Sequence, residues 1–224
     1  MKMDIENQIT KFVRKFFPYS LLKWVPSVYY MINKFRYKFI KRATVEKETS
    51  VAKVRRIKEN FFDLYCNGKG IDIGYGGDPI TNNCDTWDIE NGDAHYINKF
   101  ISKKFNYIYS SHLLEHLENP QLALTNWWKI LDINGFLILY VPDRDLYEKK
   151  KKLPSRFSLD HKFFFTIKED DPPDTIGLIS LIDKSISNYQ IVYAKVCNEG
   201  CTITDPNIHS NGEYSIEMVV KKNG

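Results

Sequence analysis

The sequence predicts an α/β fold in which a doubly wound, mostly parallel sheet ends in an antiparallel strand and follows an N-terminal helical appendage. Three observations support this prediction. Apolar, strand-like segments recur at 69–73, 105–111 and 135–141, a helical pattern at 120–131 separates the last two, and residues 213–220 alternate between polar and apolar side chains. Strands that alternate with helices typically form a parallel sheet with helices on its faces.

Charge is distributed unevenly along the 224 residues. Residues 1–60 contain fifteen Lys and Arg against five Asp and Glu, whereas residues 61–224 contain seventeen against twenty-three. We therefore predict two parts, a basic, aromatic helical segment at 1–60 and a separate domain at 61–224.

The basic N-terminal segment predicts three helices. The first spans 4–17 and stops at Pro18, the second spans 20–42 with a break at Pro26, and the third spans 44–65. Three interpretations remain open: a cap on the domain alone, a cap that also contacts an anionic membrane through residues 1–42, or nucleic-acid binding. No specific nucleic-acid motif supports the third.

The segment Lys69–Pro79 contains the most specific pattern of the chain. An apolar strand that carries Asp72 runs into the glycines Gly74, Gly76 and Gly77. In an open α/β sheet, the crevice beyond the carboxyl end of such a strand holds a nucleoside cofactor. The spacing is neither the dinucleotide pattern nor a phosphate-binding P-loop, and a carboxylate facing the pocket disfavours a phosphate ligand. A ligand with a cationic or hydroxyl-rich part fits better.

These residues resemble motif I, D-x-G-x-G-G, of the class I S-adenosylmethionine-dependent methyltransferases, and the resemblance covers roughly residues 61–145. Downstream, Asp88 ends the second strand, Gly92–Ala94 follows, residues 111–116 match S-x-x-L-E-H, and the strand 135–141 precedes Pro142. The resemblance implies a Rossmann-like fold and S-adenosylmethionine as cofactor. Its implied cofactor-binding residues are Asp72, Gly74, Tyr75, Gly76, Asp88, Asp93, Ala94 and Ser110.

One departure from the family pattern affects the adenine side of the pocket. Only four residues separate Asp88 from Asp93, where the family normally has a helix and a third strand. Either that unit is reduced to a loop here, or the assignment of Asp93 is wrong.

Methyl transfer from a sulfonium aligns acceptor, methyl group and sulfur, and a hydroxyl acceptor must also lose a proton. The catalytic candidates for accepting that proton are His112, His161 and Asp143. The alternative is that no single residue acts as the base. His116 is interpreted as a packing residue. The polar stretch 146–175, which contains His161, is expected to form a lid or a substrate-binding element.

We expect no metal. Metal-dependent O-methyltransferases gather carboxylates at the strand ends, whereas the strand at 105–111 ends in Ser110 and Ser111. The alternative metal ligands in this region are Asp143, Asp160 and His161. A clip of Cys197, Cys201 and His209 lacks a fourth ligand, and the four scattered cysteines fit reduced thiols.

The resemblance is to the small-molecule branch of the family. Within that branch, the sequence is similar to methyltransferases of surface-polysaccharide biosynthesis. It implies O- or N-methylation of a small-molecule or glycan substrate. A lipid or quinone methyltransferase and a non-catalytic cofactor-binding subunit are the alternatives. No segment approaches about 18 uncharged apolar residues and no signal peptide is apparent, so we expect a cytoplasmic protein, peripheral at the membrane if residues 1–42 bind lipid. The sequence does not indicate an oligomeric state.

Overall fold

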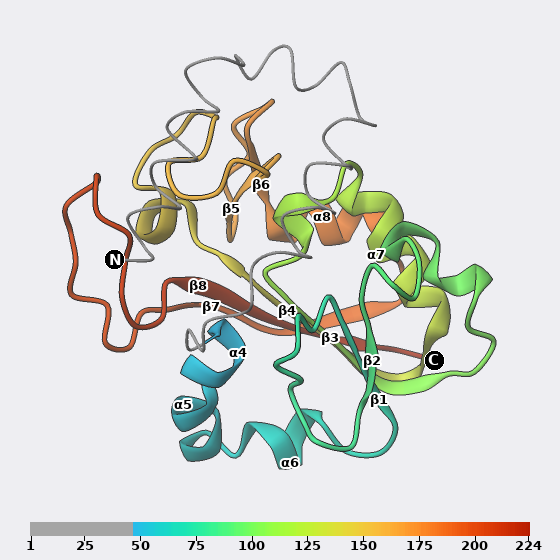
Figure 1. The fold of residues 1–224 in the computed structure, drawn as a ribbon. Coiled ribbons are helices and arrows are strands. Elements are labelled where there is room, and N and C mark those ends of the chain that lie inside the picture. Colours follow the sequence, from blue (N-terminus) through green and yellow to red (C-terminus); the bar gives the residue numbers. More distant parts are fainter. Residues whose placement is uncertain (1–46) are drawn as a thin grey trace. The chain divides into compact units, whose positions relative to one another are not determined.

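A six-stranded sheet forms the centre of the computed structural model, which describes residues 47–224 (Figure 1). The strand order is β2-β1-β3-β4-β8-β7. The strands are β1 (Gly70–Ile73), β2 (Asp85–Trp87), β3 (Phe105–Ser111), β4 (Leu131–Pro142), β7 (Tyr189–Cys197) and β8 (Ser215–Lys222). Strands β1 to β4 pair in parallel, and β8 is antiparallel to both β4 and β7. The predicted mostly parallel, Rossmann-like sheet with an antiparallel terminal strand is confirmed.

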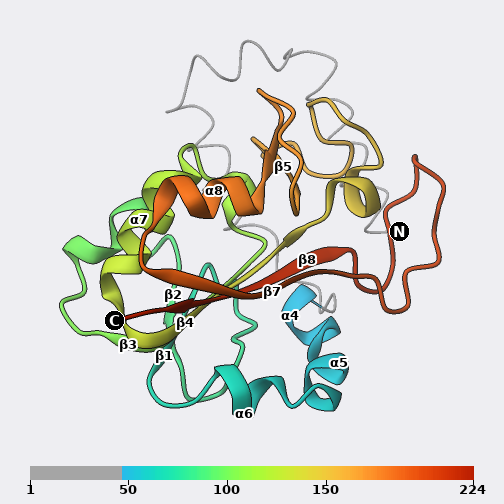
Figure 2. The same ribbon diagram turned by 180° about the vertical axis from the view of Figure 1, so that it is seen from behind.

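Helices cover both faces of this sheet. The short helices α4 (Glu48–Val51), α5 (Lys53–Lys58) and α6 (Phe61–Tyr65) lie on one face, whereas α7 (Pro120–Ile130) and α8 (Leu178–Ser185) lie on the other, as the front and back views show (Figures 1 and 2). The domain is therefore a three-layer sandwich, as expected for strands that alternate with helices.

Two apolar cores follow from the alternation of side chains along the central strands. Ile108 of β3 and Leu139 of β4 point into the core beneath α7 and α8. Their chain neighbours Tyr109 and Tyr140 point into the opposite core, which also contains Phe61 of α6. The central strands are thus buried on both faces, which explains why they read as nearly continuous apolar runs.

The prediction of one continuous helix at 44–65 is wrong, because three short helices lie within this segment. Asn60 adopts a left-handed backbone conformation with φ of 54° and separates α5 from α6. Residues 47–60 pack against the sheet, since Thr49 Oγ1 lies 3.1 Å from Tyr109 OH, and they share one compact unit, Lys47–Gly224, with the sheet. The helices predicted at 4–17 and 20–42 lie outside the described residues.

Strand β2 is the last strand at its edge of the sheet. Between it and β3 the chain forms a loop and the 3₁₀ helix η1 (Ala94–Lys99), with no strand among residues 88–104. The β-α unit that the family normally has between Asp88 and Asp93 is therefore reduced to a loop here.

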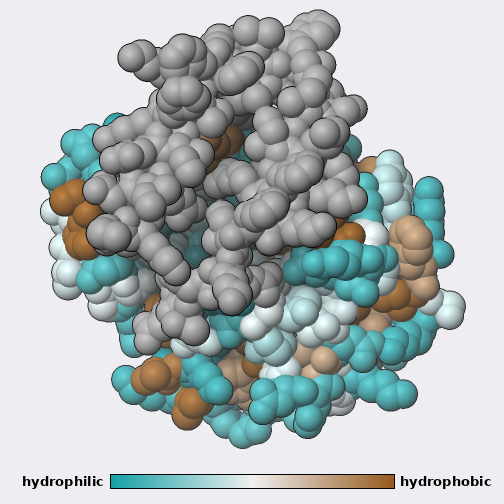
Figure 3. All heavy atoms as spheres, viewed as in Figure 1, coloured by the Kyte–Doolittle hydropathy of each residue, from teal (hydrophilic) through white to brown (hydrophobic). Residues whose placement is uncertain are grey.

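The polar stretch after β4 begins with a π-helical turn, η3 (Arg144–Glu148), and continues to a small parallel sheet of β5 (Phe164–Thr166) and β6 (Thr175–Gly177). Strand β6 leads directly into α8. Among the described residues, no helix is long and apolar enough to cross a membrane. The described surface on the face of Figure 1 is mostly hydrophilic, with separate apolar patches (Figure 3).

Candidate active site

The glycine turn after β1 sits where the carboxyl ends of β1, β2 and β3 meet. Gly74 has φ of +77°, and its N–H donates to the Trp87 carbonyl at the end of β2 over 2.7 Å. A Cβ at this position would lie 2.8 Å from Leu113 Cδ2. Glycine is thus required both for the left-handed backbone and for the close approach of the turn after β3.

Asp72 lies beneath the glycine turn and is fully buried. Its Oδ2 accepts a hydrogen bond from the Ile80 N–H over 2.8 Å, while Oδ1 has no hydrogen-bond partner among the described residues. Burial raises the pKa of this carboxyl group to about 8. Asp72 therefore shapes the loop that follows the turn, and one buried oxygen remains for a polar group of a ligand.

Residues before α4 and on it hold the outer side of the same turn. Lys47 Nζ donates to the Gly76 carbonyl, and Asp78 accepts hydrogen bonds from the N–H and hydroxyl of Ser50 at 2.9 and 2.6 Å. The turn is consequently fixed from two sides, although Tyr75 and Gly76 at its tip stay partly exposed.

The predicted adenosine-binding residues lie along the loop after β2. Asp88 follows the last residue of β2 and is partly buried, and its contact with a ribose hydroxyl stays a prediction. Asp93 caps η1, since its Oδ1 accepts from the His95 N–H over 2.9 Å, and it lies 2.7 Å from His95 Nδ1. Ala94, partly buried, accepts a hydrogen bond from Trp127 of α7 through its carbonyl.

Ser110, the remaining predicted cofactor residue, is buried at the end of β3. Its hydroxyl donates to the Ile73 carbonyl over 2.9 Å. The structure therefore uses this hydroxyl to hold β3 against β1, directly below the glycine turn.

The first candidate proton acceptor, His112, comes directly after β3 with φ of +48°. Its Nε2 lies 2.8 Å from Ser215 Oγ, and its Nδ1 lies 3.6 Å from Glu115 Oε1. Burial lowers the pKa of His112, while Glu48 and Glu115 oppose that effect. The imidazole is thus placed at the strand end, partly buried, beside a carboxylate.

The second candidate, His161, is brought to the same place from the polar stretch after β4. The imidazole is 3% exposed, its Nδ1 lies 2.9 Å from Glu148 Oε1, and its Nε2 lies 3.9 Å from Glu115 Oε1. A main-chain hydrogen bond of 2.7 Å, from the Lys162 N–H to the Glu115 carbonyl, fastens this segment to the turn after β3.

The third candidate, Asp143, caps the π-helical turn η3. Its Oδ1 accepts hydrogen bonds from the N–H groups of Asp145 and Leu146 at 2.9 and 3.0 Å. Burial raises the pKa of Asp143. The structure thus brings His112 and His161 together around Glu115 and gives Asp143 a separate capping role.

Residues 59–139, from the end of α5 into β4, match a family model described as a methyltransferase domain. This match covers the predicted motifs from the glycine turn into β4, and it supports the predicted S-adenosylmethionine-dependent methyltransferase activity and the predicted cofactor. No curated protein sequence matches the chain significantly.

Among solved structures, the methyltransferase is similar to an S-adenosylmethionine-dependent methyltransferase from Clostridium acetobutylicum, with 13% identity, a TM-score of 0.47 and coverage of 87% of this chain and 100% of that one. A second similar structure is the N-methyltransferase NodS from Bradyrhizobium japonicum, with 11% identity, a TM-score of 0.49 and coverage of 80% and 99%. A third, a methyltransferase from Archaeoglobus fulgidus, has 14% identity, a TM-score of 0.47 and coverage of 87% and 100%.

Sequence reasoning missed two carboxylates of this site, Glu115 and Glu148, whereas Asp160 was named only as a possible metal ligand. Glu115 lies at its centre and is fully buried, and Glu148 and Asp160 hold the rings of His161 and His116. The available signal was a single acid in an otherwise apolar turn, Leu113–Leu117, because an isolated buried carboxylate requires partners.

Proposed function

We propose that the methyltransferase transfers the methyl group of S-adenosylmethionine to an oxygen or nitrogen of a small molecule or glycan, such as a sugar unit of a surface polysaccharide. The observation that supports this proposal is His112, which precedes Leu113 at the glycine turn and shares the carboxylate of Glu115 with His161. An acceptor hydroxyl or ammonium group must lose a proton during methyl transfer, and imidazole accepts protons near neutral pH.

His112 is our proposed proton acceptor. It follows β3, the strand whose carboxyl end faces the glycine turn, and Leu113 next to it contacts Gly74. His161, by contrast, is held by Glu148, and Asp143 caps a helical turn. An acceptor bound above β3 would therefore meet His112 close to the methyl donor.

The cofactor part is tested by calorimetric titration with S-adenosylmethionine and S-adenosylhomocysteine. We expect both to bind the wild-type chain and Gly74→Ala to bind them at least 10-fold more weakly, because a methyl group would collide with Leu113. Gly200→Ala is the matched control, since Gly200 also has a positive φ of 72°, but an added Cβ there would meet only one atom, 3.7 Å away. Equal loss in both variants would contradict the assigned role of the turn.

The acceptor part is tested by mass spectrometry of nucleotide sugars and glycolipids incubated with the chain and S-adenosylmethionine. We expect a methylated sugar product, and we expect His112→Gln to keep cofactor binding but lose most of the turnover. Methylation of quinones or lipids alone would replace the glycan proposal by the lipid or quinone alternative. Cofactor binding with no methylation of any acceptor would favour the non-catalytic subunit.

We also propose that residues 1–42 place the methyltransferase at the cytoplasmic surface of an anionic membrane. The basic excess of residues 1–60, interleaved with aromatic side chains, supports this placement. We expect the full chain, but not a chain that lacks residues 1–42, to sediment with phosphatidylserine vesicles at low salt. Vesicle binding that survives the deletion would contradict the proposal.

A further inference from the structure

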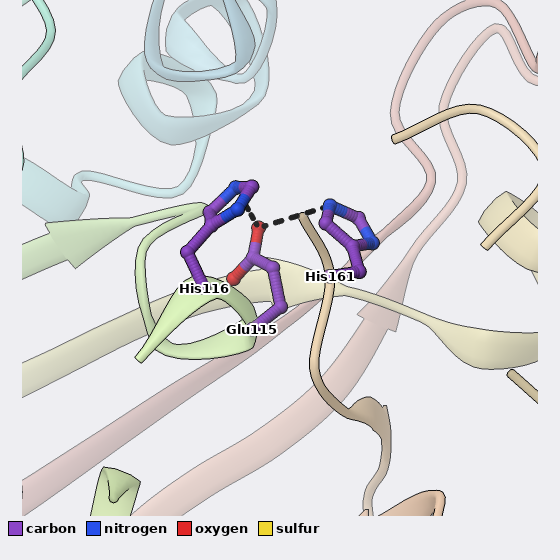
Figure 4. Close-up of side chains that lie close together, drawn as sticks. All are labelled: Glu115, His116 and His161. Atoms are coloured by element: carbon purple, nitrogen blue, oxygen red, sulfur yellow. Dashed lines mark ion pairs between the residues drawn. The ribbon is translucent and has the colours of Figure 1, made fainter. Parts of the chain in front are cut away.

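The turn after β3 and the polar stretch after β4 enclose a buried group of two imidazoles and one carboxylate. Glu115, His116 and His161 offer one ligand atom each, and these atoms lie within 4.8 Å of one another (Figure 4). We call these three residues the histidine–glutamate cluster. Glu115 Oε1 lies at its centre, 3.8 Å from His116 Nε2 and 3.9 Å from His161 Nε2.

Glu115 is the unusual member of the histidine–glutamate cluster. Its side chain is fully buried, and neither carboxylate oxygen accepts a hydrogen bond within the described part of the chain. A buried carboxylate without donors costs several kcal/mol unless something compensates its charge. The imidazoles lie too far from Oε1 for hydrogen bonds but at a suitable separation for a shared ion.

Each imidazole faces a second carboxylate with its other nitrogen, through a hydrogen bond for His161 and through an ion-pair contact without a hydrogen bond for His116. His161 Nδ1 lies 2.9 Å from Glu148 Oε1, and His116 Nδ1 lies 3.3 Å from Asp160 Oδ2. Metal-bound histidines show this arrangement, because a carboxylate on one ring nitrogen fixes the tautomer and the direction of the other. In both rings it is Nε2 that is directed to Glu115 (Figure 4).

The orienting carboxylates are themselves fixed. Glu148 Oε2 accepts the Arg156 N–H over 3.1 Å, and Asp160 Oδ1 accepts the Ser158 hydroxyl over 2.6 Å. Lys162 Nζ, the nearby cation, donates to the His116 carbonyl at 2.6 Å and lies 3.2 Å from Glu118. Three carboxylates therefore surround two imidazoles, a charge balance that accommodates a dication.

We propose that Glu115 Oε1, His116 Nε2 and His161 Nε2 bind a divalent transition-metal ion of the Zn²⁺ type. With metal–ligand bonds of about 2.0–2.1 Å, tetrahedral ligands lie roughly 3.3 Å apart, so each imidazole must approach Oε1 by roughly 0.5 Å, and the imidazoles, within 4.8 Å of each other, must approach by up to roughly 1.5 Å. Imidazole ligands favour Zn²⁺, Co²⁺ or Fe²⁺ over Mg²⁺, which requires oxygen ligands. This site replaces our expectation of no metal.

Three protein ligands leave a fourth position open, as catalytic rather than structural zinc sites do. His112 Nδ1, 3.6 Å from Glu115 Oε1, borders that side. The open position would take an oxygen or nitrogen of the acceptor molecule. The ion-binding inference itself does not depend on which acceptor is used.

The test is direct metal binding by the full chain, without any activity measurement. We titrate the metal-free protein with Zn²⁺, Co²⁺ and Mg²⁺, count bound metal by mass spectrometry and record the visible absorption of the Co²⁺ form. We expect one Zn²⁺ or one Co²⁺ per chain, Co²⁺ bands typical of a low coordination number, and no Mg²⁺.

Variants locate the ion. Glu115→Gln and His116→Gln should lose at least 100-fold in Zn²⁺ affinity, whereas Glu148→Gln, which changes only an orienting residue, should lose 10- to 100-fold. His95→Gln is the matched control, because His95 pairs with Asp93 without a third ligand. Folding of each variant is checked by circular dichroism.

The proposal is overturned if the folded wild-type chain binds neither Zn²⁺ nor Co²⁺, or if Glu115→Gln and His95→Gln bind them equally. If metal binds as expected while S-adenosylmethionine does not, the metal site stands and the proposed methylation fails. If S-adenosylmethionine binds while Zn²⁺ and Co²⁺ do not, the proposed methylation stands and the metal site fails.

Discussion

Two buried groups of charged side chains lie at different places of the same sheet and differ in how their carboxylates are satisfied. The first, which we call the arginine–glutamate network, consists of Arg55 and Arg56 of α5 and Glu213 and Glu217, which belong to β8 and its approach. The second is the histidine–glutamate cluster. In the network every carboxylate oxygen accepts at least one hydrogen bond, whereas the oxygens of Glu115 accept none among residues 47–224.

The carboxylates of the arginine–glutamate network all have donors, although Arg56 Nη1 and Nη2 have no hydrogen-bond partner among the described residues. Arg55 contacts Glu213 through Nη2 at 2.9 Å and Glu217 through Nη1 at 2.9 Å, and Arg56 Nε lies 2.7 Å from Glu217. The hydroxyls of Tyr140 and Tyr193 donate to the same two glutamates at 2.7 and 2.8 Å.

Arg56 completes the network with its guanidinium over three aromatic rings. The distances from Cζ to the ring centres are 4.7 Å for Tyr140, 5.1 Å for Tyr109 and 5.1 Å for Phe61. Such contacts compensate part of the desolvation of a buried cation.

The comparison shows how a stability element differs from a ligand site when both are buried and charged. Where arginines and tyrosines supply donors to every carboxylate oxygen, the negative charge is already compensated, and the group fastens α5 to the sheet. Where a carboxylate faces only imidazole nitrogens 3.6–3.9 Å away, a cation completes the arrangement.

The largest effect is expected from Glu217→Gln, which removes a charge from the arginine–glutamate network. Arg55 and Arg56 would stay buried with too little negative charge, so we expect a loss of about 3–5 kcal/mol in the free energy of unfolding. Urea denaturation measures it. The control is Lys195→Gln, which breaks a more exposed pair with Glu59 and should cost about 0–1 kcal/mol. Equal effects would contradict the distinction.

The pH dependence of stability should reflect the same glutamate. Burial opposes ionisation of Glu217, but Arg56 and Arg55 outweigh it and lower its pKa to about 2. A lowered pKa in the folded state stabilises the fold above the ordinary value of 4.5, and this contribution is lost as the pH falls from there towards 2.

The expected size of the loss is about 3 kcal/mol, since each pKa unit corresponds to about 1.4 kcal/mol. Urea denaturation of the wild type between pH 5 and pH 2 measures it, with Glu217→Gln as reference. If both proteins lose stability in parallel over this range, Glu217 is not responsible.

A smaller effect is expected from Tyr193→Phe, which removes one hydrogen bond from Glu217 but leaves both arginines in place. We expect a loss of about 1–1.5 kcal/mol in the free energy of unfolding, since the carboxylate keeps its other donors. Tyr96→Phe, at an exposed tyrosine of η1, serves as a control. A loss as large as that of Glu217→Gln would indicate that the hydroxyl, and not the ion pairs, holds the network.

No loss of stability is expected from Glu115→Gln in the metal-free chain. No donor is lost from its oxygens, and a neutral amide is less costly to bury than a carboxylate, so the free energy of unfolding should stay equal or rise. The wild type, but not the variant, should gain stability when Zn²⁺ is added. A large loss without metal would place Glu115 with the stability elements.

Several parts of the fold could be predicted because their signals are local. The alternation at 213–220 corresponds to β8, the apolar run at 135–141 to β4, and the helical pattern at 120–131 to α7, since period and capping are properties of neighbouring residues. The left-handed conformation of Asn60 and the start of β6 could not be predicted, because tertiary packing decides them.

The candidate site could be predicted only in part for a related reason. The residues of the glycine turn are contiguous, so their common place was visible, although the burial of Asp72 and the internal hydrogen bond of Ser110 were not. Whether each of them touches the cofactor stays a prediction. Glu148 was missed because its partner, His161, follows after an irregular segment whose path no pattern determines.

The sequence alone determined the alternation of strands and helices, the place of the glycine turn and the class of cofactor, because each depends on residues close together in the chain. Only the tertiary structure decided which charges meet. It brought the arginines of α5 onto the glutamates near and in β8, and it brought His161 to Glu115. The two groups differ in how their buried carboxylates are compensated. Glu213 and Glu217 accept hydrogen bonds from arginine and tyrosine side chains, whereas Glu115 faces imidazoles at a distance that suits a metal ion.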